Sequence, residues 1–174
     1  MKKKEITESS VATYIYNESY KSIDTYSEVI IRLIQEADPD AKLHNNNRIK
    51  NCLWAYLVSI KLTVVKNQYG EPSYNTIEQY IKDLFIKDDV GKVIYKLVIE
   101  FIQIYTYYSD VDTNPLAGYD GVNSDLVTLL LTEKSKIISE PSSSMIFMLK
   151  LNMLLTEAIC KPLIEWMEQH ELVR

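Results

Sequence analysis

The feature that most limits the fold of this chain is a recurrence of apolar side chains every three to four residues. In the clearest example one helical face of residues 89–108 carries Val90, Val93, Ile94, Leu97, Val98, Phe101, Ile102, Tyr105 and Tyr108. Only four glycines and five prolines occur in 174 residues, which favours long helices over many short strands. We predict an all-α bundle of six or seven helices that forms a single domain over residues 7–174, after a flexible tail at residues 1–6.

Two predicted helices, at about 47–67 and 144–160, are apolar on nearly all sides. A helix of this kind is normally buried all round, so we expect both to be central. Further helices are predicted at about 7–37, 75–86, 89–108 and 123–139.

Some boundaries depend on single residues. Ser19 and Ser22 interrupt the apolar face of the first helix, so we expect a weak point or break around residues 17–22. Asn75 is expected to cap the short helix that follows it. Pro162 lies in the continuation of the sixth helix and either kinks it or begins a separate last helix.

The charge balance limits the partners. With 24 acidic and 19 basic residues the net charge is −5, which disfavours nucleic acid and anionic membranes and suits a basic protein. The start MKKKEITESS lacks the apolar run of a signal peptide, and the apolar window 145–155 is too short to span a bilayer. Cys52 and Cys160 form no metal-binding motif, so we expect free thiols and a cytoplasmic protein.

An acidic segment between two apolar stretches resembles a calcium-binding loop at its first positions, where Asp110, Asp112 and Asn114 alternate with other residues. The position that needs glycine is occupied by Pro115, and the position of the bidentate glutamate is occupied by Gly121. We therefore interpret the segment as a turn, with a weak cation site as the alternative and no expected cofactor.

The thirteen tyrosines are the best indication of function, because exposed tyrosine is enriched at protein interfaces. Several, such as Tyr16 and Tyr26, lie on apolar faces, whereas Tyr119 is expected at a loop tip. The candidate interaction surface combines aromatic and acidic residues: Tyr107, Tyr108, Asp110, Asp112, Tyr119 and Asp120.

The sixth helix carries an amide, Asn152, on an otherwise apolar side. A hydrogen bond inside the core is one interpretation, and a seam between two copies of the chain is the other. We expect Met145, Met148 and Met153 of the same helix to fill the core.

Residues for catalysis are scarce. His44 and His170 have no suitably spaced nucleophile or acid, and no nucleotide-binding or zinc motif occurs. Glu100 is expected to form a boundary ion pair with a lysine.

These observations favour a non-enzymatic protein-binding module. Its size and acidity would suit a small inhibitor, immunity-type or adaptor protein of a virus, phage or mobile element. Alternatives are a homo-oligomeric structural protein, in which a homodimer buries apolar faces, and a small helical enzyme or ligand carrier without a recognisable motif.

Overall fold

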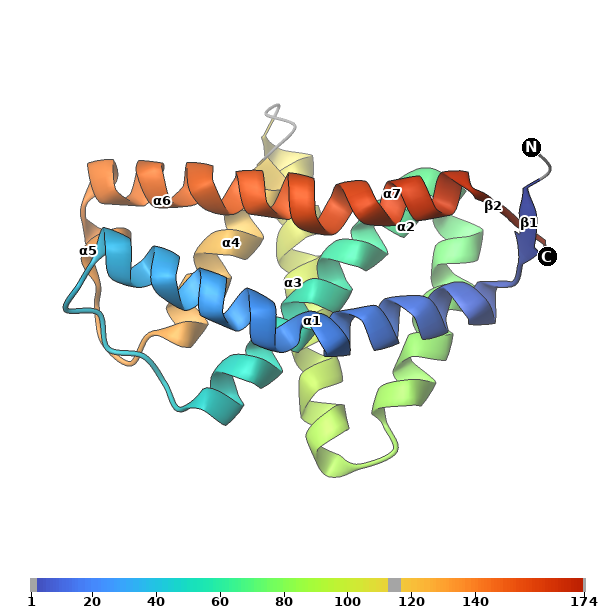
Figure 1. The fold of residues 1–174 in the computed structure, drawn as a ribbon, viewed down its shortest axis with the longest axis horizontal. Coiled ribbons are helices and arrows are strands. Elements are labelled where there is room, and N and C mark those ends of the chain that lie inside the picture. Colours follow the sequence, from blue (N-terminus) through green and yellow to red (C-terminus); the bar gives the residue numbers. More distant parts are fainter. Residues whose placement is uncertain (1–2, 113–116, 174) are drawn as a thin grey trace.

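A computed structural model describes residues 3–112 and 117–173 and confirms the predicted all-α bundle (Figure 1). The elements in chain order are β1 (Lys4–Ile6), α1 (Glu8–Ala37), α2 (Asn46–Phe85), α3 (Asp89–Val111), α4 (Ala117–Leu130), α5 (Lys136–Ser139), α6 (Pro141–Leu154), the π-helix η1 (Leu155–Cys160), α7 (Lys161–Glu168) and β2 (His170–Leu172).

The first half of α2 is the central helix, as predicted from its apolar circumference. Every side chain in residues 55–65 is buried, among them Tyr56, Leu57 and Leu62. The helix kinks at Gly70, whose φ of 78° is accessible to glycine and strained for other residues. The start predicted for the helix at 75–86 is therefore wrong. The observed helical segment begins just after Gly70, so Asn75 lies inside it and does not cap it.

The second predicted central helix, residues 144–160, is instead peripheral. It lies along the upper edge of the molecule in Figure 1 and buries only one face, through Phe147, Leu151, Leu155 and Ile159. Its opposite face is apolar as well but exposed, so the composition of a helix did not reveal how many of its sides are covered.

Pro162 lies in the first turn of the last helix, α7, as the second alternative predicted, although α7 continues the path of α6 and η1. The helical path runs from Pro141 to Glu168, and the turn before the proline widens into η1, where the Lys161 amide donates to the carbonyl oxygen of Thr156. Pro162 has no N–H to offer the carbonyl of Ala158, four residues earlier. The hydroxyl of Tyr26 on α1 donates to that carbonyl oxygen instead, at 2.6 Å.

Helix α1 is continuous, so of the weak point or break predicted around residues 17–22 the break does not occur. Thr7 caps its start by accepting a hydrogen bond from the Ser10 amide. The Ser22 hydroxyl donates to the Glu18 carbonyl oxygen at 2.6 Å, which satisfies the serine inside the helix. Ser19 is small enough to be fully buried where a larger side chain would hold the neighbouring helices apart.

The segment interpreted as a turn is shorter than predicted, because α3 continues to Val111 and α4 already includes Ala117. Gly118 and Gly121 are therefore helical residues. A Cβ on Gly118 would lie 2.2 Å from Ser109 Oγ, and one on Gly121 would lie 2.2 Å from Tyr108 Cδ2. Their role is to let α3 and α4 approach closely.

The helix predicted at 123–139 is divided. After α4 ends at Leu130, Leu131 forms an antiparallel bridge with Leu43, and a new short helix, α5, begins at Lys136. The buried carboxylate of Asp38 accepts hydrogen bonds from the Ser135 hydroxyl (2.7 Å) and the Lys136 amide (2.9 Å), which fixes this second start.

Residues 4–6 are not part of a flexible tail. They form β1, which pairs in parallel with β2 so that Lys4 lies opposite His170 and Ile6 opposite Leu172. Ile6 is buried. The two ends of the described chain thus lie side by side, as Figure 1 shows.

Candidate functional site

A hollow of about 430 Å³ lies between α3 and α4, on the side of α3 that faces away from the core. It is lined by Glu100, Gln103, Ile104, Tyr107 and Tyr108 from α3 and by Asp125 and Leu129 from α4. The residues from α3 are three or four apart, so they share one helical face. We refer to these seven residues as the α3–α4 hollow.

Two tyrosines form its aromatic wall. Tyr107 is 62% exposed and Tyr108 45% exposed, and their rings meet nearly at right angles with centroids 5.3 Å apart. Tyr108 also contacts the backbone of α4 closely, because Gly121 has no side chain to displace it. The wall is thus supported from one side and open to solvent on the other.

Two carboxylates complete the hollow. Burial, and secondly the negative charge of Glu100, raise the pKa of the Asp125 carboxyl. Glu100 forms a solvent-exposed ion pair of 3.8 Å with Lys96, as predicted for a boundary glutamate. Within residues 3–112 and 117–173, Asp125 has no ion pair of its own, so a cation brought to this hollow would stabilise its charged form.

The structure keeps only part of the predicted interaction surface together. Tyr107, Tyr108, Asp110 and Asp112 are exposed at the C-terminal end of α3. Tyr119, predicted at a loop tip, instead lies in α4 with its ring 4.9 Å from that of Tyr105, and burial raises the pKa of its phenol.

Asp120, the sixth predicted residue, has a structural role. Its carboxylate accepts a hydrogen bond of 2.6 Å from Asn152 on α6. Asn152 accepts one of 2.8 Å from Asn123, which in turn accepts one of 2.7 Å from the buried phenol of Tyr56. This row joins α2, α4 and α6, and it confirms that Asn152 makes hydrogen bonds inside the fold.

Sequence reasoning missed Asp125, Leu129, Ile104 and Gln103 as neighbours of Tyr107. The signal was present for α3, since Glu100, Gln103, Ile104 and Tyr107 follow the spacing of a single helical face. The contribution of α4 was hidden, because the sequence does not show which face of the helix predicted at 123–139 lies beside α3.

The cation site weighed in the sequence gains no support. Asp110 lies in the last turns of α3 and Asp112 caps that helix, while Asn114 is outside the described residues. In the described ranges no group of three or more histidine, cysteine or acidic side chains is placed to hold a metal.

The two histidines lie apart. The backbone amide of His44 donates a hydrogen bond to the carbonyl oxygen of Leu130, at the end of α4. His170 Nδ1 lies 2.6 Å from the Trp166 carbonyl oxygen beside β2. Neither belongs to the α3–α4 hollow.

Lys61 is a buried lysine that the sequence did not distinguish from the exposed ones. Lys61 lies in the most apolar part of α2, and burial lowers its pKa to about 8, opposed by the nearby carboxylate of Glu18. Cys160 is close by, and burial raises the pKa of its thiol to about 11. The thiol is therefore protonated at neutral pH and is a weak nucleophile.

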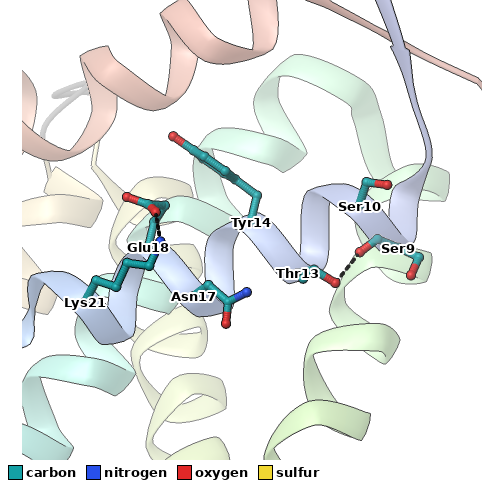
Figure 2. A pocket seen from close by; sticks show the side chains of 7 residues that line it. All are labelled: Ser9, Ser10, Thr13, Tyr14, Asn17, Glu18 and Lys21. Carbon is teal, nitrogen blue, oxygen red and sulfur yellow. Dashed lines mark hydrogen bonds and ion pairs between the residues drawn. The ribbon is translucent and has the colours of Figure 1, made fainter.

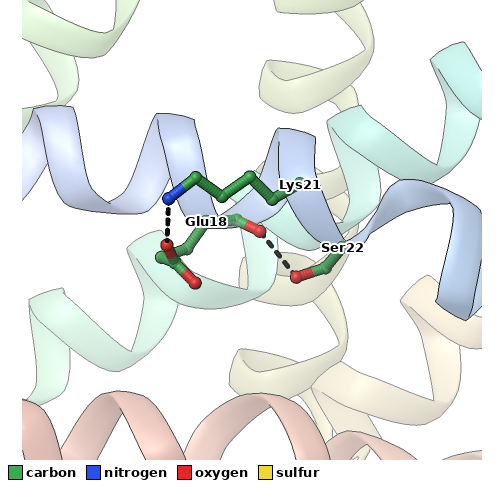
Figure 3. A network of polar contacts seen from close by, with 3 residues as sticks. All are labelled: Glu18, Lys21 and Ser22. Atoms are coloured by element: carbon green, nitrogen blue, oxygen red, sulfur yellow. Dashed lines mark hydrogen bonds and ion pairs between the residues drawn. The ribbon is translucent and has the colours of Figure 1, made fainter.

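A second hollow, of about 390 Å³, lies along α1 (Figure 2) and is lined by Ser9, Ser10, Thr13, Tyr14, Asn17, Glu18 and Lys21. All seven come from one helix. Glu18 pairs with Lys21 at 3.1 Å while its backbone carbonyl accepts the Ser22 hydroxyl (Figure 3). The polar groups that line this second hollow already bond within α1 or point to solvent, so they do not converge on a ligand.

The outer side of α6 is an exposed apolar surface. Met145, Ile146, Leu149 and Met153 are between 55% and 71% exposed, so the prediction that Met145 and Met153 fill the core is wrong. The helical run Pro141–Glu168, with a mean hydropathy of 1.3 in its most apolar window, is long and apolar enough to cross a membrane by length and composition alone. The window 145–155 considered in the sequence is thus part of a longer apolar helical run.

Comparison of the chain with protein-family models, curated proteins and solved structures finds no match in any of the three.

Proposed function

We propose that the protein is a non-enzymatic binding module that holds a basic segment of another protein in the α3–α4 hollow. The observation that carries this proposal is the placement of two carboxylates, Glu100 and Asp125, beside an exposed aromatic wall. Carboxylates attract the charged end of an arginine or lysine, and aromatic rings accept its cation and its apolar stem.

The surroundings favour the same kind of partner. Asp110 and Asp112 extend the acidic character beyond the hollow, and the whole chain has a net charge of −5. Complementary charge raises the rate of encounter, while buried aromatic contacts slow dissociation. An inhibitor or adaptor of a basic protein would use both the charge attraction and the aromatic contacts.

Selection of peptides provides a direct test. A random peptide library is selected on the immobilised protein, and the dissociation constants of the recovered peptides are measured by calorimetry. We expect recovered peptides to carry arginine or lysine beside an apolar residue, and we expect Tyr107→Ala and Asp125→Lys each to weaken binding more than tenfold.

Tyr80→Ala is the matched control, because Tyr80 is an exposed tyrosine (43%) on α2, outside the hollow. The proposal is overturned if the recovered peptides lack basic residues. It is equally overturned if Asp125→Lys binds them as tightly as the unchanged protein does.

A further inference from the structure

The outer side of α6 presents an uninterrupted apolar stripe, which we call the α6 stripe: Met145, Ile146, Leu149 and Met153. A contiguous exposed apolar patch of this kind is often a site of interaction with another molecule. The α6 stripe shares no residue with the α3–α4 hollow, so what covers it is a separate question from the proposed function.

Three of the four residues of the stripe are spaced symmetrically. Leu149 lies at its centre, with Met145 four residues before it and Met153 four residues after it. If a second α6 runs antiparallel across a two-fold axis at Leu149, Met145 of each copy faces Met153 of the other, and the two Leu149 side chains meet. Methionine is unbranched and adapts to such a contact.

The charges beside the stripe permit this approach. Lys150 is paired with Glu36 of α1 at 2.8 Å, and Glu157 is paired with Lys161 at 3.2 Å. Because each charge is already balanced within its own copy, two stripes can meet without repulsion between unpaired charges.

The exposed area also suits two copies. Four side chains of this size and exposure present on the order of 500 Å² per copy, so two copies bury about 1,000 Å², the lower limit for a specific interface. The expected association is therefore weak, in the micromolar range.

A lipid surface fits less well. Helices that lie on membranes carry lysine and arginine on the polar face and tryptophan or phenylalanine on the apolar face. The α6 stripe has no aromatic residue, and Trp166 of α7 is stacked on Tyr14 at 4.0 Å between ring centroids.

We infer that the α6 stripe is the interface of an antiparallel homodimer, with Leu149 on the two-fold axis. Sedimentation of the full chain between about 1 and 200 µM tests the association. The unchanged protein is expected to dimerise reversibly in this range, and Leu149→Glu is expected to raise the dissociation constant more than tenfold.

Val93→Glu is the control, because Val93 is 61% exposed on α3 and lies outside the stripe. Circular dichroism verifies that both variants are folded. Leu149→Cys adds a positional test: on oxidation it is expected to form a disulfide between copies, whereas Val93→Cys is not. Both native cysteines are buried and do not compete.

The inference is overturned by an unchanged protein that stays monomeric at 200 µM, or by a dimer that Leu149→Glu leaves intact. Vesicles of neutral and anionic phospholipid form the remaining arm. A monomer that floats with these vesicles through Leu149 would assign the stripe to lipid and also overturn the inference.

Discussion

The hydroxyl of Tyr26 donates a hydrogen bond to the carbonyl oxygen of Ala158, the group that Pro162 leaves without its helical donor. A side chain of α1 thus compensates for a proline 136 residues away (162 − 26). The contact also ties the first long helix to the widened turn η1.

Tyr26→Phe is expected to lower the free energy of unfolding by about 1–2 kcal/mol, because it leaves the Ala158 carbonyl without a donor. Urea denaturation measures the change, with Tyr80→Phe on the exposed side of α2 as the control. In a Pro162→Ala background the new amide can take over the bond, so Tyr26→Phe should cost less there. An equal cost in both backgrounds would argue against compensation.

Lys61→Met is expected to stabilise the fold near pH 7. Burial lowers the folded-state pKa of Lys61 from 10.5 to about 8, so the unfolded chain binds this proton more tightly. The difference of about 2.5 pKa units corresponds to about 3 kcal/mol, at 1.36 kcal/mol per unit.

The same shift fixes the pH dependence. Between about pH 8 and pH 10.5 the Lys61 amine is neutral in the folded protein and still protonated in the unfolded chain. The free energy of unfolding of the unchanged protein should therefore rise with pH over this range. Thermal melts of both proteins from pH 7 to 10 should therefore show their difference in stability shrinking. A difference that is constant with pH would mean that Lys61 reaches solvent.

Gly91→Ala and Gly121→Ala should differ in severity. A Cβ at Gly91 would lie 1.9 Å from the backbone carbonyl oxygen of Phe85, which cannot move without disturbing the turn between α2 and α3. The three atoms nearest to a Cβ at Gly121 all belong to the ring of Tyr108, a side chain that can move. We expect a loss of about 3 kcal/mol or more at Gly91 and about 1 kcal/mol at Gly121. Chemical denaturation gives the order, and a reversed order would contradict this packing.

Asn152→Leu should cost about 1–3 kcal/mol, although it makes the helix more apolar. It removes the partner of Asp120 and of the buried amide of Asn123. Asn67→Leu, at an exposed position of α2, controls for the change in residue type. Equal stability of the two variants would show that the polar row contributes nothing.

The sequence was sufficient for the class of fold and for the central position of residues 47–67, because both follow from the spacing and density of apolar side chains. It was insufficient where distant segments decide local structure. The break after Leu130 depends on Leu43 and Asp38, and the tolerance of Pro162 depends on Tyr26.

The candidate sites were predicted only in part, for a related reason. Periodicity identifies an apolar face but not whether a neighbour covers it, so residues 144–160 were placed centrally and the exposed Met145 and Met153 were missed. Tyr107 was correctly expected to lie off the apolar face of its helix. Tyr108 was placed on that apolar face by the periodicity and is nevertheless exposed. Tyr119 was displaced by an error of a few residues in the start of α4.

The parallel pairing of β1 with β2 has a consequence for the order in which the fold forms. Strand β1 can pair only after residue 172 has been synthesised, because its partner β2 lies at residues 170–172. Exchange of the Val173 amide, which donates to the Ile6 carbonyl oxygen, therefore reports whether these two distant segments have paired.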